Sequence, residues 1–499
     1  MLPADIPLGS PIPASPHAVS VSLPTLAAVR GYEEKDPAIV RQMQLGYPRF
    51  FLHPFVAALA RAVAGPFPGR TVWLVSSAGM AAQAAERLNG LRPGCAEAFA
   101  DGGIHGLAHA ESPDLAVQAK LFLQHVGGFL SSRQAEDELV RRGLRPAAHP
   151  EPLFAGDAAA EVRRHLRTAL PEAGPEDIFL APSGMNAIYA AYRAIGEAQA
   201  ARGRTEWVQL GWLYLDSIAL LRKFTPPGGY HHQADVSDLG ALERLLRARA
   251  GRIAGLVTEV PTNPLIQTGD VAGLSALCAA HGVALVLDLS VSSPFNLNGL
   301  PHADLAVASL TKYTASAGDV IAGMVAVNPR RAGAAEWRGR LPRWLEPLYA
   351  RDLARLAAQI GATPAVLARI NAAAPRVAAF LSGHPGVAAV YWAEQPGSAE
   401  QYRRLLHPGG GPGGMISFVL KGDLAAFYDR LRLRKGPSFG MTTTLICPFL
   451  YLAHYDLVST PAGRAELAAN GLDPGLLRLC VGTEPAEEII AALAAALPS

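Results

Sequence analysis

The chain has 499 residues, of which half are apolar and 17% are charged, and its net charge is +2. This length allows two or three domains around a large core. The small net charge argues against a nucleic-acid surface, and no apolar run is long enough to cross a membrane. The N-terminus has no signal-peptide pattern, and the four cysteines show no metal-type spacing. We therefore expect a cytoplasmic protein with reduced thiols and no bound metal.

Residues 1–50 are predicted to form an N-terminal arm. Its first 30 residues are rich in Pro, Ser and Ala, and the piece Leu45-Gly-Tyr-Pro-Arg-Phe-Phe51 is extended around its proline. Tyr47 and Arg49 can then point to one side, where they could hold a phosphate. The alternative is a loop with an ordinary surface arginine.

Residues 71–150 contain a strand and several helices, but no chemistry can be assigned to them. The pattern predicts strand 71–76, helix 81–88, a Gly- and Ala-rich loop at 91–106, helices 113–124 and 131–142, and a linker at 145–152.

From about residue 155 strands and helices alternate regularly. The predicted strands are 177–181, 206–211, 253–259, 283–288, 304–308 and 320–327, with helices at 157–170, 183–200, 215–223, 238–249 and 270–281. Strands that are almost wholly apolar indicate a mostly parallel sheet covered on both faces. Ligands on such sheets gather at strand C-termini and helix N-termini.

The last third of the chain predicts a smaller α+β domain after a helical stretch at 328–380. Its strands are expected at 387–392, 415–420 and 476–481, and its helices at 423–433 and 485–497. We place the domain boundaries at 1–50 for the arm, 51–345 for the main domain with 71–150 as an insertion, and 346–499 for the C-terminal domain.

Lys312 differs from the other five lysines because it ends an apolar run, Leu305 to Leu310, between two hydroxyls at Ser309 and Thr311. An ammonium drawn into such a strand end loses hydration, so its pKa falls and it becomes a usable amine. That setting suits a Schiff-base lysine. The alternative is a lysine whose head reaches water.

Other segments end or begin elements at the same expected edge. Ser183-Gly184-Met185 follows a strand and starts a helix, where backbone amides suit a phosphate or the serine simply caps the helix. Ser76-Ser-Ala-Gly-Met80 has the same pattern and is a second possibility. Asp288 ends a buried strand and could pair with a pyridinium nitrogen or cap the next loop. Asn263 precedes a proline at another strand end.

Several motifs in this order resemble the Cys/Met-metabolism family of pyridoxal-phosphate enzymes, and most closely its fungal-type cystathionine γ-synthases. The pieces that carry the resemblance are Ser20-Val-Ser-Leu-Pro, Gly31-Tyr-Glu-Glu, Gly46-Tyr-Pro-Arg-Phe-Phe, Ser183-Gly-Met-Asn-Ala-Ile, Lys435-Gly-Pro-Ser-Phe-Gly and Leu452-Ala-His-Tyr. Several motifs in one order are far more specific than any one alone.

The resemblance implies an α/β type I fold, like that of aspartate aminotransferase, with pyridoxal 5'-phosphate as cofactor. Lys312 would hold the cofactor aldehyde and then move protons. The further residues implied are Asp288 at the pyridine nitrogen; Asn263 near the ring hydroxyl; Gly184, Met185, Ser309 and Thr311 at the phosphate; Tyr214 stacked on the ring; Arg478 and Ser438 at the substrate carboxylate; and Tyr47 and Arg49, contributed by a neighbouring subunit of a homodimer or homotetramer.

The resemblance implies γ-replacement on an activated homoserine ester with cysteine, giving cystathionine. A carbon–sulfur lyase on the same fold is the first alternative, because fold does not settle the reaction. A catalytically silent binding or regulatory protein is the second. Leu289-Ser290, where the family often has Asn-Thr, and Leu215-Asp-Ser217, where it usually has Gly-Gly-Thr, leave details of the ring contacts open.

Overall fold

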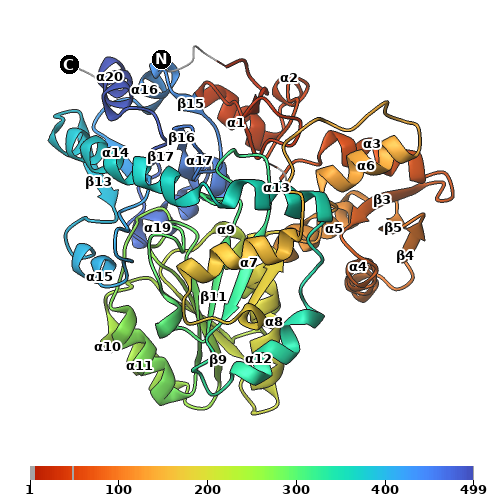
Figure 1. The fold of residues 1–499 in the computed structure, drawn as a ribbon, viewed down its shortest axis with the longest axis horizontal. Coiled ribbons are helices and arrows are strands. Elements are labelled where there is room, and N and C mark those ends of the chain that lie inside the picture. The colour runs from red at the N-terminus through yellow and green to blue at the C-terminus, as the bar shows by residue number, and fades with distance from the viewer. Residues whose placement is uncertain (1–5, 48–49, 498–499) are drawn as a thin grey trace.

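The computed structural model describes residues 6–47 and 50–497, and within these residues a seven-stranded sheet forms the centre (Figure 1). Its strands lie in the order β6 (Ile178–Ala181), β12 (Gly323–Val327), β11 (Leu305–Ser309), β10 (Ala284–Asp288), β9 (Ile253–Glu259), β7 (Glu206–Leu210) and β8 (Tyr230–Gln233). From β11 to β8 neighbouring strands are parallel, whereas β12 is antiparallel to β11 and β6. The predicted α/β fold with a mostly parallel sheet is confirmed.

Both faces of this sheet are covered, which explains why its strands are apolar throughout. In β10, Leu285 and Leu287 face one core while Val286 faces the other. The Val286 core includes α5 (Pro113–Val126), α8 (Gly184–Ala200), α9 (Leu215–Phe224) and α12 (Ala334–Arg340). The opposite core includes α7 (Ala158–Ala169), α10 (Leu239–Ala248), α11 (Val271–His281) and α13 (Ala350–Ile360).

The register of the parallel strands brings their polar ends to one edge. Asp288 pairs with Glu259 on one side and with Val307 on the other. Lys312 follows three residues after the end of β11, and α8 begins directly after the turn that leaves β6. These parallel strand ends and one helix N-terminus therefore meet at the predicted ligand edge.

The C-terminal part forms a second sheet, drawn in blue in Figure 1. Its order is β13 (Val387–Trp392), β14 (Met415–Leu420), β17 (Leu477–Cys480), β16 (Leu445–Pro448) and β15 (Arg434–Lys435). The helices of this part are α14 (Thr363–Gly383), α15 (Ala399–Arg403), α16 (Leu424–Arg430), α17 (Phe449–Ala453), α18 (Tyr455–Val458), α19 (Pro461–Ala469) and α20 (Ala486–Ala496). Arg478, in β17, faces the main domain from this sheet.

The N-terminal part carries β1 (Pro11–Ile12), β2 (Ser20–Val21), α1 (Leu26–Glu34), α2 (Pro37–Val40) and α3 (Pro54–Val63). The insertion follows with β3 (Arg70–Val75), α4 (Ala78–Leu91), β4 (Ala96–Asp101), β5 (Ile104–Ala110), α5 and α6 (Ser132–Arg141). Its small sheet has the order β3-β5-β4 and lies beside the main body in Figure 1.

The prediction of a loop at residues 91–106 is wrong, because this stretch contains β4 and the start of β5. Gly106, at the end of this predicted loop, lies in β5. In the structure it pairs with Phe99 across the two strands, and a Cβ at residue 106 would stand 2.2 Å from the Phe99 ring. Glycine here permits a close approach of an aromatic ring within a sheet.

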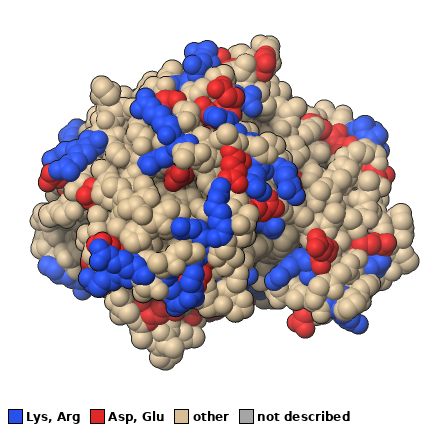
Figure 2. All heavy atoms as spheres, turned by 90° about the horizontal axis from the view of Figure 1, so that it is seen from below, with Lys and Arg blue, Asp and Glu red and all other residues tan. Residues whose placement is uncertain are grey.

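Charges of both signs are interspersed on the face seen in Figure 2, with blue and red side chains beside each other. Among the described residues, Arg403 forms an ion pair with Glu394. Among residues 6–47 and 50–497, no helix combines the length and apolarity that a bilayer crossing requires.

Candidate active site

A cavity of about 120 Å³ lies where the strand ends of the main sheet meet the C-terminal sheet. Its wall contains eleven of the residues predicted from the sequence: Tyr47, Gly184, Met185, Tyr214, Asn263, Asp288, Ser309, Thr311, Lys312, Ser438 and Arg478. Arg49 lies outside the described residues. Residues scattered over more than 400 positions thus meet in one place, whereas the similar turn at Ser76-Ser-Ala-Gly-Met80 contributes nothing to this wall.

Lys312 is 6% exposed, and its side chain lines the cavity. Its Nζ donates to Ser438 Oγ at 2.6 Å and to Tyr47 Oη at 3.2 Å. The rings of Phe439 and Tyr47 lie 4.8 and 5.2 Å from the same nitrogen. Buried between hydroxyls and aromatic faces, this amine has partners that can take or return a proton.

Asp288 lies at the end of β10 and is almost fully buried. It accepts a hydrogen bond of 2.8 Å from the Ser290 backbone N–H and forms no ion pair with any described residue. Burial raises the pKa of Asp288 to about 6. A cationic N–H group placed against it would restore its ordinary ionised state.

Glu259 ends the neighbouring strand and was not among the predicted site residues. One of its oxygens accepts from the Tyr214 backbone N–H, while Oε2 has no hydrogen-bond partner among the described residues. Burial, and then the charge of Asp288, raise its pKa well above the usual value. The sequence signal was available, since Glu259 is a carboxylate that ends an apolar strand, as Asp288 is.

The start of α8 forms a narrow cradle. Ser183 Oγ accepts from the Asn186 backbone N–H at 3.0 Å and so caps the helix. A Cβ at Gly184 would lie 2.8 Å from Ser309 Cβ, so the approach of α8 to the end of β11 requires glycine. Free backbone amides and the helix dipole favour an anion such as a phosphate at this end.

Arg478 reaches the cavity from the C-terminal sheet. It donates to the Ser438 carbonyl at 3.1 Å and to Asn263 Oδ1 at 3.4 Å, and the Phe449 ring lies 4.5 Å from its guanidinium carbon. Ser438 adopts a φ of +78°, which costs a non-glycine residue roughly 1–3 kcal/mol. This strained turn directs the Ser438 hydroxyl to Lys312 and its carbonyl to Arg478.

Tyr47 reaches the cavity from the N-terminal arm, together with Val19 and Phe50. Within the chain, Tyr47 Oη accepts a hydrogen bond from Lys312 Nζ. The contribution of Tyr47 by a neighbouring subunit, which the resemblance implies, stays a prediction. Val19 and Phe50 were not predicted, because nothing in an extended arm indicates where its apolar side chains dock.

The residues at this site fit pyridoxal phosphate. The N-terminus of α8 suits the phosphate, Lys312 offers an amine for the aldehyde, and Asp288 lacks a cationic partner that the ring nitrogen can supply. Fold and site together therefore define a pyridoxal-phosphate enzyme of the α/β type.

Comparison with known proteins gives the family. A sequence profile of the Cys/Met metabolism PLP-dependent enzymes matches residues 164–498, and the chain belongs to this family. The predicted family and the cofactor pyridoxal 5'-phosphate are confirmed.

The relatives differ in the reactions that their names describe. The L-2-amino-4-chloropent-4-enoate dechlorinase/desaturase of Streptantibioticus cattleyicolor is 40% identical, with 96% of each chain covered. The cystathionine gamma-synthase of Neurospora crassa is 28% identical, over 97% of this chain and 96% of its own. Among solved structures, a cystathionine gamma synthase from Xanthomonas oryzae pv. oryzae, in complex with aminoacrylate and cysteine, is 25% identical with a TM-score of 0.57, over 68% of this chain and 85% of its own.

Proposed function

We propose that the protein removes a leaving group from the γ-carbon of a small, largely apolar L-2-amino acid, using pyridoxal phosphate. The observation that carries this proposal is the composition of the cavity wall. Lys312 and Arg478 are its only cationic side chains among the described residues. One carboxylate can be clamped by Arg478, and the described part of the wall offers no second cation to a distal carboxylate.

The remainder of the wall is suited to an apolar side chain. Beyond the groups assigned to the cofactor and the carboxylate, it includes the apolar residues Val19, Phe50, Ile321, Phe439, Phe449 and Leu452. A four- or five-carbon amino acid would place its γ-carbon among these groups. Burying such a side chain is favourable, whereas burying a second ammonium or carboxylate without a partner is costly.

Lys312 is the proton carrier in this proposal. Bound pyridoxal phosphate supplies an electron sink that makes the hydrogens on Cα and Cβ acidic. The Lys312 amine takes the Cα proton, returns it, and then takes a Cβ proton, so that only one proton is lost in total. The Tyr47 and Ser438 hydroxyls, at 3.2 and 2.6 Å, hold the amine in place. Arg478 holds the substrate carboxylate, and the cavity wall excludes water from the γ-carbon.

The name of the 40% identical relative is consistent with this chemistry. In L-2-amino-4-chloropent-4-enoate the chlorine is on C4, which is the γ-carbon. Loss of chloride from C4 and of one carbon-bound proton balances as loss of HCl and leaves one more unsaturation. We therefore name a γ-chlorinated, unsaturated L-amino acid as the substrate class.

Cystathionine synthesis, expected from the sequence, is the second candidate. It also begins with loss of a leaving group from Cγ, and relatives named cystathionine gamma-synthase align with most of the chain. Cysteine would then have to enter as a second amino acid. The lyase alternative, cleavage of cystathionine, likewise requires the cavity to accept a second amino-acid group at the far end of the substrate.

Incubation of the holoenzyme with single substrates separates these functions. With L-2-amino-4-chloropent-4-enoate we expect release of chloride and a product lighter by one HCl in the mass spectrum. O-Acetyl- or O-succinylhomoserine with cysteine should give little cystathionine, and cystathionine alone should give little ketoacid and ammonia. Efficient condensation without dechlorination would overturn the proposal in favour of the synthase, and efficient cleavage of cystathionine would favour the lyase.

A further inference from the structure

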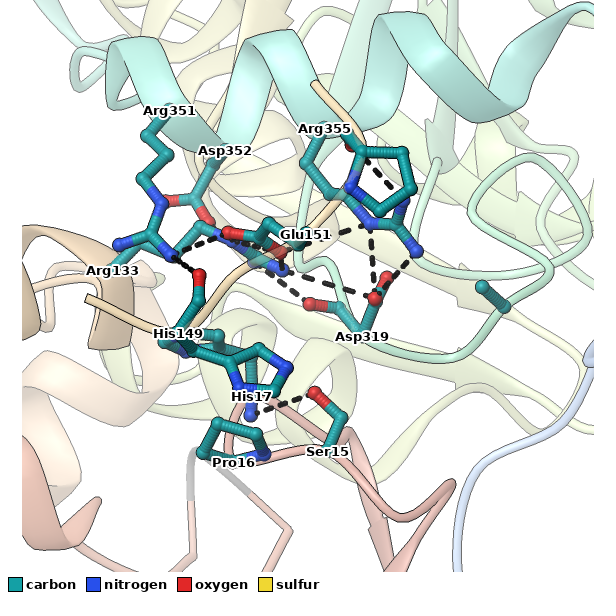
Figure 3. Close-up of polar contacts among 12 residues, drawn as sticks. Ser15, Pro16, His17, Arg133, His149, Glu151, Asp319, Arg351, Asp352 and Arg355 are labelled. Carbon is teal, nitrogen blue, oxygen red and sulfur yellow. Dashed lines mark hydrogen bonds and ion pairs between the residues drawn. The ribbon is translucent and has the colours of Figure 1, made fainter. Parts of the chain in front are cut away.

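A cluster of buried carboxylates outside the cavity wall shows one way in which this chain holds such groups (Figure 3). Asp352 Oδ1 accepts a hydrogen bond from Arg133 at 2.9 Å, and the Asp319 carboxylate accepts one from Arg355 at 2.8 Å. Each of these carboxylates thus faces a guanidinium, which offsets the cost of removing the carboxylate from water.

Glu259, in the cavity wall, is held differently. It is 5% exposed, as Asp352 is, but its hydrogen bond comes from the backbone of another segment. One of its oxygens accepts from the Tyr214 N–H, whereas Oε2 has no hydrogen-bond partner in the part of the chain that the structure describes. A buried oxygen without a partner is costly, so stability alone does not explain a glutamate at this position.

The contact with Tyr214 fixes the start of α9. Tyr214 is the N-cap residue of this helix, and its own side chain makes no capping hydrogen bond. The Glu259 carboxyl reaches from the end of β9 and binds the N-cap backbone N–H, as the third residue of a helix does in a capping box. Because the Tyr214 side chain lines the cavity, this contact fixes the backbone from which its ring projects.

The same carboxyl interacts with the segment that follows β9. Burial and the charge of Asp288 raise the pKa of Glu259 well above its usual value. A hydrogen bond from the Asn263 backbone and the charge of Arg478 oppose this rise in pKa. Asn263 Oδ1 in turn accepts from Arg478 at 3.4 Å. The Glu259 carboxyl therefore contacts Tyr214 and also the segment that supports Arg478.

We propose that Glu259 is a positioning residue, which holds Tyr214 and Asn263 in one fixed arrangement around the cofactor ring. The resemblance to the family implies that these two residues lie at the ring, but it assigns no role to Glu259. The positioning role concerns cofactor binding, so it applies equally to a dechlorinase, a synthase or a lyase. Measurements of cofactor binding therefore test it independently of the proposed reaction.

Two conservative variants separate the reach of this side chain from its charge. Glu259→Gln keeps an oxygen that can accept from the Tyr214 N–H, whereas Glu259→Asp keeps the carboxylate but is one methylene shorter. Absorbance titration of each apoprotein with pyridoxal phosphate gives the dissociation constant, and visible circular dichroism of the bound cofactor reports how its ring is held.

We expect Glu259→Gln to resemble the wild type in both measurements. Glu259→Asp should bind pyridoxal phosphate about tenfold more weakly and give a weaker dichroic band, because its shorter side chain loses the hydrogen bond from Tyr214. Unchanged affinity in Glu259→Asp, or a loss in Glu259→Gln as large as that in Glu259→Asp, would overturn the proposal.

A double-mutant cycle tests whether Glu259 acts through Tyr214. Tyr214→Leu removes the ring, and Glu259→Asp is combined with it. If Glu259 positions the ring, the combined loss of cofactor affinity is clearly smaller than the product of the two single losses. A combined loss equal to that product would overturn the proposal, because Glu259 would then act independently of Tyr214.

Asp352→Asn is the matched control for a buried carboxylate that only stabilises the fold. Asp352 is as buried as Glu259, but it lies in the cluster of Figure 3 and does not line the cavity. We expect this variant to unfold at a lower denaturant concentration while its affinity for pyridoxal phosphate and its dichroic band remain those of the wild type. A dichroic band weakened as much as in Glu259→Asp would show that the band reports general packing and would overturn the positioning role of Glu259.

Discussion

Glu259 and Asp288 end two neighbouring parallel strands at the same level of the sheet, and both carboxyl groups are buried in the cavity wall. Burial raises the pKa of Asp288 to about 6, and burial together with Asp288 raises that of Glu259 well above its usual value. Two carboxylates in one dry site cannot both ionise cheaply. Burial therefore favours the protonated form of Glu259 over its ionised form, and a cationic partner would favour ionised Asp288.

The first prediction concerns Asp288→Asn in the apoprotein. Because the folded pKa, about 6, lies above the ordinary 3.8, ionisation of Asp288 destabilises the fold. The loss begins as pH rises above 3.8, grows until about pH 6 and is then constant. Asparagine avoids this loss and can still accept from Ser290. We expect the apo variant to be more stable than the wild type at pH 7.5, by up to about 3 kcal/mol.

Denaturant unfolding of both apoproteins at several pH values checks this prediction. The stability difference should shrink as pH is lowered from 7.5 towards 4. The same variant should bind pyridoxal phosphate at least about tenfold more weakly, because the ring nitrogen loses its anionic partner. A variant that is less stable than wild type at pH 7.5, or that binds the cofactor equally well, would contradict the account of this carboxylate.

The second prediction concerns Gly184→Ala. Alanine would place a Cβ 2.8 Å from Ser309 Cβ and so push apart the start of α8 and the end of β11, where the phosphate is expected. We expect pyridoxal phosphate to bind at least about tenfold more weakly, equivalent to 1.4 kcal/mol. The affinity for pyridoxal, which has no phosphate, should change little. Absorbance titrations of the apoprotein with both compounds measure the difference.

Gly196→Ala in the same helix is the matched control. A Cβ at Gly196 meets only one atom of Trp207, at 4.0 Å, so no contact has to move. This substitution should stabilise the fold by up to about 1 kcal/mol through helix propensity and leave both affinities unchanged. Equal losses of pyridoxal and of its phosphate in the Gly184 variant would show that the cradle does not bind the phosphate.

The third prediction distinguishes two buried lysines. Lys312 and Lys435 are 6% and 5% exposed, but Lys435 donates to the Pro24 carbonyl of the N-terminal arm and to the Asp429 carbonyl of the C-terminal part, and it does not line the cavity. Borohydride reduction of the holoenzyme, followed by peptide mapping, should find the cofactor on Lys312 alone. In Lys312→Ala no lysine should carry it. An unchanged adduct in that variant would refute the assignment.

The regular part of the fold was predictable because buried parallel strands are apolar runs with polar ends. The strand at 253–259 was predicted without error, and the ends of β10 and β11 indicated Asp288 and Lys312. Short or exposed strands gave no such signal. Tyr230–Gln233 has no apolar run, and Arg434–Lys435 is only two residues long.

The connections between distant segments could not be predicted from sequence. Arg133 stands in a polar helix and resembles any solvated arginine, yet 1% of it is exposed, because its partners Glu151, Asp319 and Asp352 come from three other segments. Likewise, nothing near Tyr47 in sequence indicates which chain's Lys312 it contacts. Such pairings depend on tertiary packing, whereas the apolar run and polar end of a buried strand can be recognised within a short stretch of sequence.

The last prediction concerns Arg478→Lys. The guanidinium is fixed by Asn263 and by the Ser438 carbonyl, so its planar fork can take both oxygens of a substrate carboxylate. An ammonium provides a single point charge and cannot reproduce this geometry. We expect kcat/KM to fall about 10- to 100-fold, mainly through KM, since a charged hydrogen bond contributes about 1.5–3 kcal/mol. The visible absorbance of the bound cofactor should be retained.

The carboxamide of the substrate shows whether the loss of kcat/KM comes from recognition of the substrate carboxylate. Wild type should strongly prefer the free acid to its carboxamide, and Arg478→Lys should lose most of that preference because the fork that recognises two oxygens is gone. Arg376→Lys, at an exposed pair with Glu487, is the control and should change neither kinetics nor stability by more than about 1 kcal/mol. An undiminished preference for the acid in the Arg478 variant would mean that another group clamps the carboxylate.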